Sequence, residues 1–331
     1  MKKYIMIFTA AIVMAGTIMA CGPAKAEDAS NGDRLQIVTT IFPEYDWVKT
    51  ILGDNPGNAE VTMLLDNGVD LHSYQPTTED MLKISSCDMF VYVGGESDEW
   101  VEDALAVAQN KDMQVVNLLE VLGDSVKEEE VVEGMEHDHD EEGEEHEHEE
   151  GEAEYDEHVW LSLRNSVSLV DSIEKSIETI DAANADVYRA NADALVSKLK
   201  ALDKEYEETV SAATVDTILF GDRFPFRYLA DDYGLNYYAA FVGCSAETEA
   251  SFETIVFLAD KVDELSLKAV LTIEGSDQKI AETIVENTKT KDQQILTMDS
   301  MQSVTSEDVE AGVSYLSIME NNLEVLKEAL K

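Results

Sequence analysis

The histidines are the residues in this sequence whose chemistry is most specific. The chain has 331 residues and six histidines, five of which lie between His137 and His158 in a stretch dense in Asp and Glu. Imidazoles and carboxylates are together ligands for Zn²⁺ and related divalent ions. A metal site needs ligands held in fixed geometry, so the surroundings of each histidine decide which of them belong to one.

The stretch from 128 to 157 contains 18 Asp or Glu residues among 30 and no Lys or Arg. Such a segment cannot bury enough apolar area to fold alone, so we expect a loop. Two His-X-His pairs lie in it and can bind zinc weakly: His137, His139, His146 and His148. We expect a loop that captures or senses zinc beside the main site. The alternative is a disordered insertion that only adds solubility.

Two histidines and one aspartate lie where packed elements can hold them. His72 follows an expected strand, where open α/β sheets bind ligands, although a plain surface histidine is the alternative. His158 is followed by the apolar triplet Val159–Leu161, which must pack. Asp299 follows another expected strand at the same kind of edge. Two imidazoles and a carboxylate suit Zn²⁺ or Mn²⁺.

The elements that must position these residues follow an α/β pattern. Short apolar runs of strand type alternate with helical patterns, which implies mainly parallel sheets with covered faces. The expected strands are 35–41, 59–65, 88–95, 113–119, 214–221, 235–243, 268–275 and 293–298. Between the two halves, residues 184–213 contain no Gly or Pro and carry an apolar stripe at helical spacing. This predicts about 45 Å of continuous helix connecting them.

The start of the chain has the features of a secretory signal. A charged start precedes an apolar run at 5–20 that is too short to span a bilayer. Residues 17–20 before Cys21 resemble a bacterial lipoprotein box, in which the cysteine is acylated; an ordinary signal peptide is the alternative. We expect a signal peptide at 1–20 and a flexible tether at 21–34.

Composition narrows the class of protein further. The formal net charge of −47 excludes a nucleic-acid partner, because phosphate binding requires a basic surface. Apart from Cys21, the two cysteines Cys87 and Cys244 make no disulfide framework, so packing must stabilise the fold. About 300 residues beyond the signal allow two domains of ordinary size.

Seven segments, in order, resemble those of the metal-binding lipoproteins that serve ABC importers of zinc and manganese. They are "DLHSYQPTTEDM", "DMFVYVGGESDEWVEDAL", "EHVWLSL", "VYRANADALVSKLKALD", "YLADDYGL", "IEGSDQKIAETI" and "LTMDS". The resemblance implies two Rossmann-like α/β lobes joined by one rigid helix, with the metal in the cleft between them. The expected lobes are 35–183 and 212–331, with the linking helix at 184–211.

The resemblance also implies a function. A His-rich acidic loop before the second histidine is typical of the zinc members. The chain is therefore expected to be a monomer, not an enzyme, that delivers Zn²⁺ to an ABC importer permease. A lipid anchor would hold it at the outer face of the cytoplasmic membrane.

The resemblance assigns three ligands and leaves a fourth open. His72 and His158 match the two histidines of the first lobe, and Asp299 matches the carboxylate of the second. The remaining ligand, a His or Glu in the family, falls on Arg223, and a guanidinium cannot ligate a cation. Four replacements are open: Asp222, Glu274, Cys244 or a water molecule.

Each side-chain replacement has a separate argument. Asp222 needs a slip of one residue, and Arg223 would then pair with an acidic neighbour and orient it. Glu274 lies where the family keeps an acid near the metal, generally not as a ligand. Cys244 would favour zinc through its thiolate, but the interpretation we prefer from the sequence is a small buried thiol.

Three other functions compete with zinc delivery. A manganese-binding member of the same family is the first. The second is a zinc hydrolase with an open position on the metal, against which stand the missing His-Glu-X-X-His type of motif and the two-lobed design. The third is an adhesin, since related lipoproteins have been described as such; no residue supports it directly.

Overall fold

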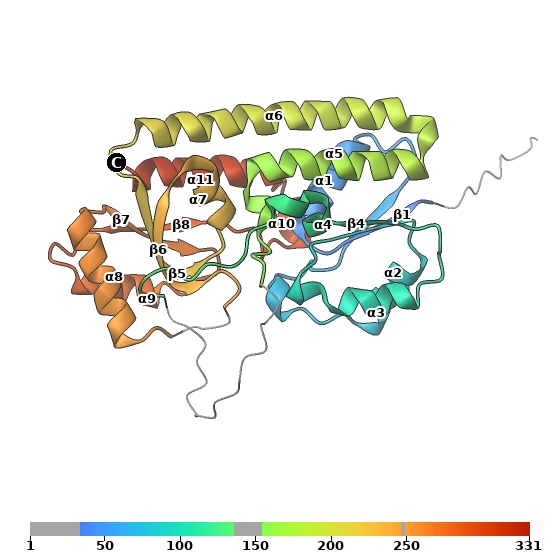
Figure 1. Ribbon diagram of the computed structural model, residues 1–331. Coiled ribbons are helices and arrows are strands. Elements are labelled where there is room, and N and C mark those ends of the chain that lie inside the picture. The colour runs from blue at the N-terminus through green and yellow to red at the C-terminus, as the bar shows by residue number, and fades with distance from the viewer. Residues whose placement is uncertain (1–33, 136–153, 246–248) are drawn as a thin grey trace, which may run out of the picture. The chain divides into compact units, whose positions relative to one another are not determined.

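Two four-stranded parallel sheets form the framework of the protein (Figure 1). The computed structural model describes residues 34–135, 154–245 and 249–331. The expected signal peptide, Cys21 and the four loop histidines (137, 139, 146 and 148) lie outside the described residues. Within the described part of the chain, no helix has both the length and the apolar character needed to cross a bilayer.

The first sheet has the strand order β2-β1-β3-β4, all parallel. Its strands are β1 (Gln36–Thr39), β2 (Glu60–Met63), β3 (Met89–Tyr92) and β4 (Gln114–Asn117). The helices are α1 (Phe42–Leu52), α2 (Thr78–Ser86), α3 (Trp100–Ala106), α4 (Leu118–Leu122) and α5 (Leu163–Ile180). In the described residues, short 3-10 turns are η1 (Leu71–Ser73), η2 (Glu96–Asp98), η3 (Gly123–Ser125), η4 (Val159–Leu161) and η5 (Ala182–Asn184).

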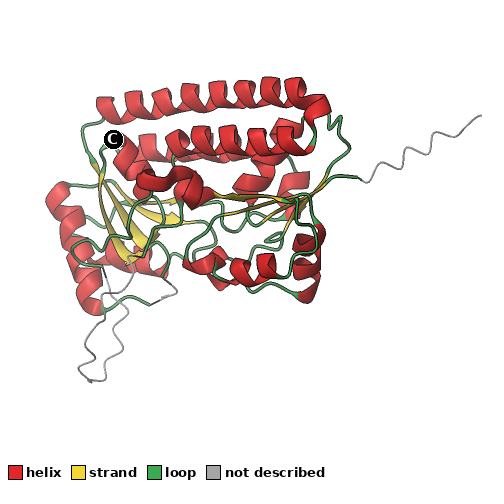
Figure 2. Ribbon diagram, turned by 45° about the vertical axis from the view of Figure 1, so that its right-hand side comes forward, coloured by secondary structure: helices red, strands yellow, loops and turns green. Residues whose placement is uncertain are grey.

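The second sheet repeats this arrangement with the order β6-β5-β7-β8. Its strands are β5 (Thr217–Phe224), β6 (Asn236–Val242), β7 (Ala269–Ile273) and β8 (Gln294–Met298). Its helices are α7 (Arg227–Tyr233), α8 (Phe252–Leu265), α9 (Lys279–Asn287), α10 (Ser306–Glu310) and α11 (Tyr315–Ala329). Helices lie on both sides of the strands (Figure 2), which buries both faces and explains the nearly continuous apolar runs. The predicted α/β fold is confirmed.

The long helix α6 (Ala185–Ala212) lies where it was predicted. Its apolar stripe is buried, with Tyr188 and Tyr206 both 0% exposed. Asn191 donates a hydrogen bond to Ile51 O of α1 at 3.0 Å, and Tyr206 Oη donates one to Met319 O of α11 at 2.6 Å. The helix is therefore bonded to both sheet systems. Residues 34–331 group as one compact unit, so the division into lobes at 184 and 212 stays a prediction.

The turn η4 joins the two lobes directly. Its three residues are fully buried, as predicted for the apolar triplet. Trp160 Nε1 donates a hydrogen bond to Ser300 O at 2.9 Å, and Tyr315 Oη donates one to Trp160 O at 2.7 Å. Both partners belong to the second lobe. The residue just before this turn, His158, is therefore held by packing from both sides.

Candidate metal centre

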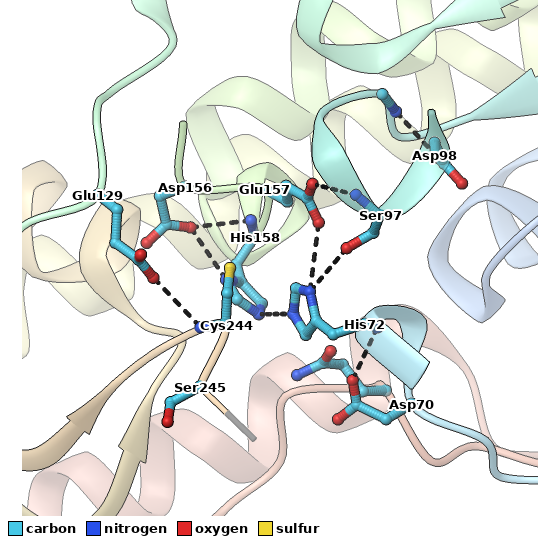
Figure 3. A network of polar contacts seen from close by, with 12 residues as sticks. Asp70, His72, Ser97, Asp98, Glu129, Asp156, Glu157, His158, Cys244 and Ser245 are labelled. Atoms are coloured by element: carbon cyan, nitrogen blue, oxygen red, sulfur yellow. Dashed lines mark hydrogen bonds and ion pairs between the residues drawn. The ribbon is translucent and has the colours of Figure 1, made fainter. Parts of the chain in front are cut away.

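Two imidazoles meet between the lobes (Figure 3). His72 lies on η1, beyond the carboxyl end of β2, and His158 immediately precedes η4. Their Nε2 atoms are 3.2 Å apart and their ring centroids 5.1 Å apart. The side chain of His158 is 0% exposed and that of His72 is 12% exposed. The structure thus brings together the two histidines that the sequence analysis selected.

An aspartate two residues before each histidine fixes its backbone. Asp70 Oδ1 accepts a hydrogen bond from His72 N at 3.0 Å, and Asp156 Oδ1 accepts one from His158 N at 2.9 Å. The Asp-X-His spacing is the same in "DLH" and "DEH". Neither aspartate was predicted as a site residue, although this repeated spacing was a signal that could have found them.

The Nδ1 atom of each ring faces side-chain oxygen atoms. His72 Nδ1 lies 2.8 Å from Ser97 Oγ and 3.3 Å from Glu157 Oε2. His158 Nδ1 lies 3.0 Å from Asp156 Oδ1. A proton on each Nδ1 leaves a lone pair on each Nε2, the form in which imidazole binds a metal. Burial alone would lower the pKa of His158, but the adjacent Asp156 carboxylate outweighs it and the pKa is raised.

The separation of the two Nε2 atoms fits one shared metal ion. Two lone pairs that face each other across 3.2 Å repel unless a cation or a proton lies between them. Zinc–nitrogen bonds of about 2.05 Å at a tetrahedral angle place two ligand nitrogens about 3.3 Å apart. The arrangement therefore has the geometry of half a tetrahedral site.

A thiol from the second lobe joins the imidazoles. Cys244 follows β6, and its Sγ and one nitrogen of each ring all lie within 4.8 Å of one another. Among the residues that the structure describes, these three side chains are the one group of His, Cys, Asp and Glu with metal-binding spacing. The glycine at position 243 lets the backbone before Cys244 pass close to the imidazole of His158, because a Cβ at this position would lie 3.0 Å from Cε1 of His158. Burial, followed by the charges of Asp156 and Glu129, raises the pKa of the Cys244 thiol.

Asp299, which the sequence analysis selected as a ligand, is not a member of this group. Its Oδ1 accepts a hydrogen bond from Met301 N at 2.7 Å, within its own loop. Its backbone N–H donates one to Asn322 Oδ1 at 2.8 Å. Burial raises the pKa of Asp299. A ligand role for this carboxylate stays a prediction.

The two other acidic candidates also have partners elsewhere. Asp222 accepts hydrogen bonds from Arg223 N at 2.9 Å and from Ile273 N at 3.3 Å. Glu274 accepts from Ser300 N and Oγ, each at 2.7 Å. The bond from Ile273 connects β7 to β5, and the bonds from Ser300 connect the segments that follow β7 and β8. Burial and the charge of Asp299 raise the pKa of Glu274 to about 7.

Arg223 connects the segments that carry two members of the cluster. Its Nη2 lies 2.7 Å from Asp70 Oδ2, and its Nη1 donates a hydrogen bond to Ser245 O at 3.3 Å. Asp70 holds the turn of His72, and Ser245 follows Cys244. From the sequence, Arg223 was expected to orient a neighbouring acid. Its partner is Asp70 of the first lobe, across 153 positions of sequence.

A cavity of about 240 Å³ opens beside the cluster, and its wall is rich in glutamates. It is lined by His72, Glu96, Ser97, Glu129, Glu154, Tyr155, Glu157 and Cys244. Part of this wall is formed where the two ends of the acidic loop pair. Glu129 N donates to Glu154 O at 2.8 Å, and Asp156 N donates to Lys127 O at 2.9 Å. Clustered carboxylates of this kind attract cations toward the imidazoles.

Known proteins share this fold and much of this sequence. Residues 37–329 match the family model described as zinc-uptake complex component A, periplasmic. The chain is 33% identical over 315 residues to the zinc-binding lipoprotein AdcA of Streptococcus pneumoniae serotype 4, a match that covers 94% of this chain and 58% of the relative. It is 30% identical over 315 residues to the high-affinity zinc uptake system protein ZnuA of Bacillus subtilis, which covers 95% and 93%.

Solved structures of related proteins have the same fold. The Zn(II)-bound ZnuA-like domain of Streptococcus pneumoniae AdcA has a TM-score of 0.68 at 29% identity, covering 90% of this chain and 99% of that one. The metal-dependent lipoprotein YcdH of Bacillus subtilis has a TM-score of 0.71 at 26% identity, with the same coverage. The chain spans 58% to 61% of the length of the first curated relatives that it matches. It belongs to the family of periplasmic zinc-uptake complex component A.

Proposed function

We propose that the protein captures Zn²⁺ outside the cytoplasm and delivers it to the permease of an ABC importer. The observation that carries this proposal is that the Nε2 atoms of the two imidazoles are 3.2 Å apart. The Nδ1 atom of each ring faces side-chain oxygen atoms. When each Nδ1 carries a proton, both Nε2 lone pairs are available to a metal, and capture then requires no rearrangement of the imidazoles. The names of the relatives, zinc-binding lipoprotein and zinc uptake protein, support the same ion.

The arrangement suits a cargo ion better than a resident one. His72 and His158 belong to the first lobe and Cys244 to the second, so any separation of the lobes removes a ligand from the ion. The glutamates of the 240 Å³ cavity raise the local cation concentration at the entrance. Binding is therefore fast, and release is coupled to a change in the cleft.

The cellular setting is part of the proposal. Solute-binding proteins of this family work with ABC importer permeases. The protein acts as a monomer without enzymatic activity, tethered through Cys21 to the outer face of the cytoplasmic membrane. Zinc is the cargo rather than manganese, because imidazole ligands suit Zn²⁺ whereas Mn²⁺ prefers oxygen.

Zinc titration of the purified protein tests the proposal. His72→Ala and His158→Ala should each abolish tight 1:1 binding in calorimetry and leave the circular dichroism spectrum unchanged. His148→Ala, in the acidic loop, is the matched control and should keep the tight site. A wild-type protein with no tight zinc site, or histidine variants that bind as the wild type does, would overturn the proposal.

A further inference from the structure

We propose that the thiolate of Cys244 is a zinc ligand and forms a His₂Cys set with His72 and His158. This inference rests on the proposed zinc capture and specifies which second-lobe atom holds the ion. The primary observation is geometric. The sulfur and one nitrogen of each imidazole lie within 4.8 Å of one another, so one ion can touch all three.

The backbone around Cys244 is fixed from several directions. Cys244 N donates a hydrogen bond to Glu129 Oε1 at 3.3 Å. Glu129 belongs to the neck of the acidic loop, where residues 127–129 pair with 154–156. Ser245 N donates to Val242 O at 3.3 Å, which closes a turn at the end of β6. Arg223 Nη1 donates to Ser245 O from β5. A thiol on a segment held in this way has a defined position, as a ligand requires.

The other described cysteine shows what a purely structural thiol looks like in the same chain. Cys87 is 0% exposed, and its Sγ donates to Ile84 O at 3.3 Å and lies 3.2 Å from Met113 Sδ. Cys244 instead is partly exposed and lines the cavity that contains His72. Small buried thiols pack against apolar groups. Cys244 faces nitrogen ligands and carboxylates.

A second-lobe ligand is also needed for chemical reasons. Arg223 occupies the position where the family resemblance implied one, and its guanidinium donates to Asp70 and cannot bind a cation. Among the described second-lobe side chains, Cys244 is the one that shares the cluster of the two imidazoles. Binding through Cys244 replaces its S–H bond by a Zn–S bond and releases one proton to solvent.

The ligand set makes a prediction about the choice of metal. Thiolates bind Zn²⁺ strongly, whereas Mn²⁺ prefers carboxylate, carbonyl and water oxygens. One thiolate and two neutral imidazoles therefore favour zinc over manganese. Replacing the sulfur by a hydroxyl should reduce this preference, because it removes the softest of the three ligands.

Cobalt(II) is the probe, since it occupies zinc sites and reports a bound thiolate by a sulfur-to-metal charge-transfer band in the near ultraviolet. The full chain, its Cys244→Ser variant and the matched control Cys87→Ser are each titrated with Co²⁺ and then with Zn²⁺. The wild type and the control should show the band. Cys244→Ser should lack it and lose zinc affinity by more than the roughly 10- to 100-fold typical of removing a group that only orients a ligand.

The outcomes separate this inference from the proposed function. Tight zinc binding by the wild type without the cobalt band, or a band that persists in Cys244→Ser, overturns the role of Cys244 and leaves zinc capture standing. No tight binding of either metal by the wild type overturns both. If Cys244→Ser does not fold, Cys244→Ala replaces it, and an unchanged ratio of zinc to manganese affinity in that variant contradicts the inference.

Discussion

Asp70 and Asp156 have the same contact with the backbone of a histidine, but the other contacts of their carboxylates differ. Each accepts a hydrogen bond from the backbone N–H of the histidine two residues later. Asp156 Oδ1 also accepts from the imidazole, at 3.0 Å, whereas Asp70 Oδ2 faces Arg223. One aspartate therefore orients a ring, and the other connects a turn to the opposite lobe.

Asp156→Asn tests the first role. The amide oxygen can still accept from His158 N, but the negative charge beside Nδ1 is lost. We expect zinc affinity to fall by roughly 10- to 100-fold, as when other groups that orient a ligand are removed. Competition with a chromophoric chelator measures it. Glu154→Gln on the same cavity wall is the control, and an equal loss in that variant would mean that the charge acts only through the general field.

At the scale of elements, the short apolar runs predicted the eight described strands. Parallel strands that are buried on both faces are apolar along nearly their whole length, so their sequences do not alternate between apolar and polar residues. The packing of His158 could also be predicted from the sequence, since an apolar triplet follows this residue. The position of Cys244 beside His158 was not. It depends on how the second sheet faces the first, and that relation is set by tertiary contacts with no local signal in the sequence.

The Asp70–Arg223 pair belongs to this tertiary level and can be tested by itself. Arg223→Met keeps much of the side-chain volume and leaves the Asp70 carboxylate without its cation. Both side chains are about one-fifth exposed, so the free energy of unfolding should fall by only about 1–2 kcal/mol, less than for a fully buried pair. Zinc affinity should fall as well, because the turn of His72 and the loop of Cys244 lose a shared contact.

Urea denaturation and zinc competition measure the two effects of Arg223→Met. Arg227→Met is a suitable control, since Arg227 pairs with Glu130 at 2.8 Å but has no bond to either ligand segment in the described residues. A loss of stability without a loss of zinc affinity would show that Arg223 holds the lobes together and does not position the site.

The neck of the acidic loop makes a separate prediction. Backbone hydrogen bonds between 127–129 and 154–156 hold the segment that carries Asp156. Deletion of 133–151 should therefore keep one tight zinc site and remove weaker ones, which calorimetry with excess zinc counts. Disappearance of the tight site along with the loop would instead make the loop histidines the primary ligands.

At the scale of the whole molecule, the acidic composition extends into the core. Glu44 is 0% exposed, and its Oε2 accepts from Thr40 N at 2.8 Å. Among the described residues, its Oε1 and Asp98 Oδ1 have no hydrogen-bond partner. Burial, and next the charge of Asp98, raises the pKa of Glu44 to about 8. Burial raises the pKa of Asp98 to about 7.

These raised pKa values fix the sign of the pH dependence of stability. Near neutral pH the folded protein keeps a proton on Glu44 that the unfolded chain releases. Its contribution is fully present below the unfolded pKa, here 4.5, and is lost as the pH rises through about 8. Each extra proton held by the folded state lowers the free energy of unfolding by about 1.4 kcal/mol per pH unit across that window.

Glu44→Gln should therefore flatten the fall in stability between about pH 5 and 8, because an amide resembles the protonated acid and does not titrate. Urea denaturation at several pH values measures the slope, and Glu102→Gln on the exposed face of α3 is the control. The variant should be less stable than the wild type near pH 5 only by the cost of fitting the amide, and the difference should reverse or narrow toward pH 8. Parallel curves for the two proteins would show that Glu44 is ionised in the fold. In that case its charge is balanced by the hydrogen bonds from Thr40 and Ile41.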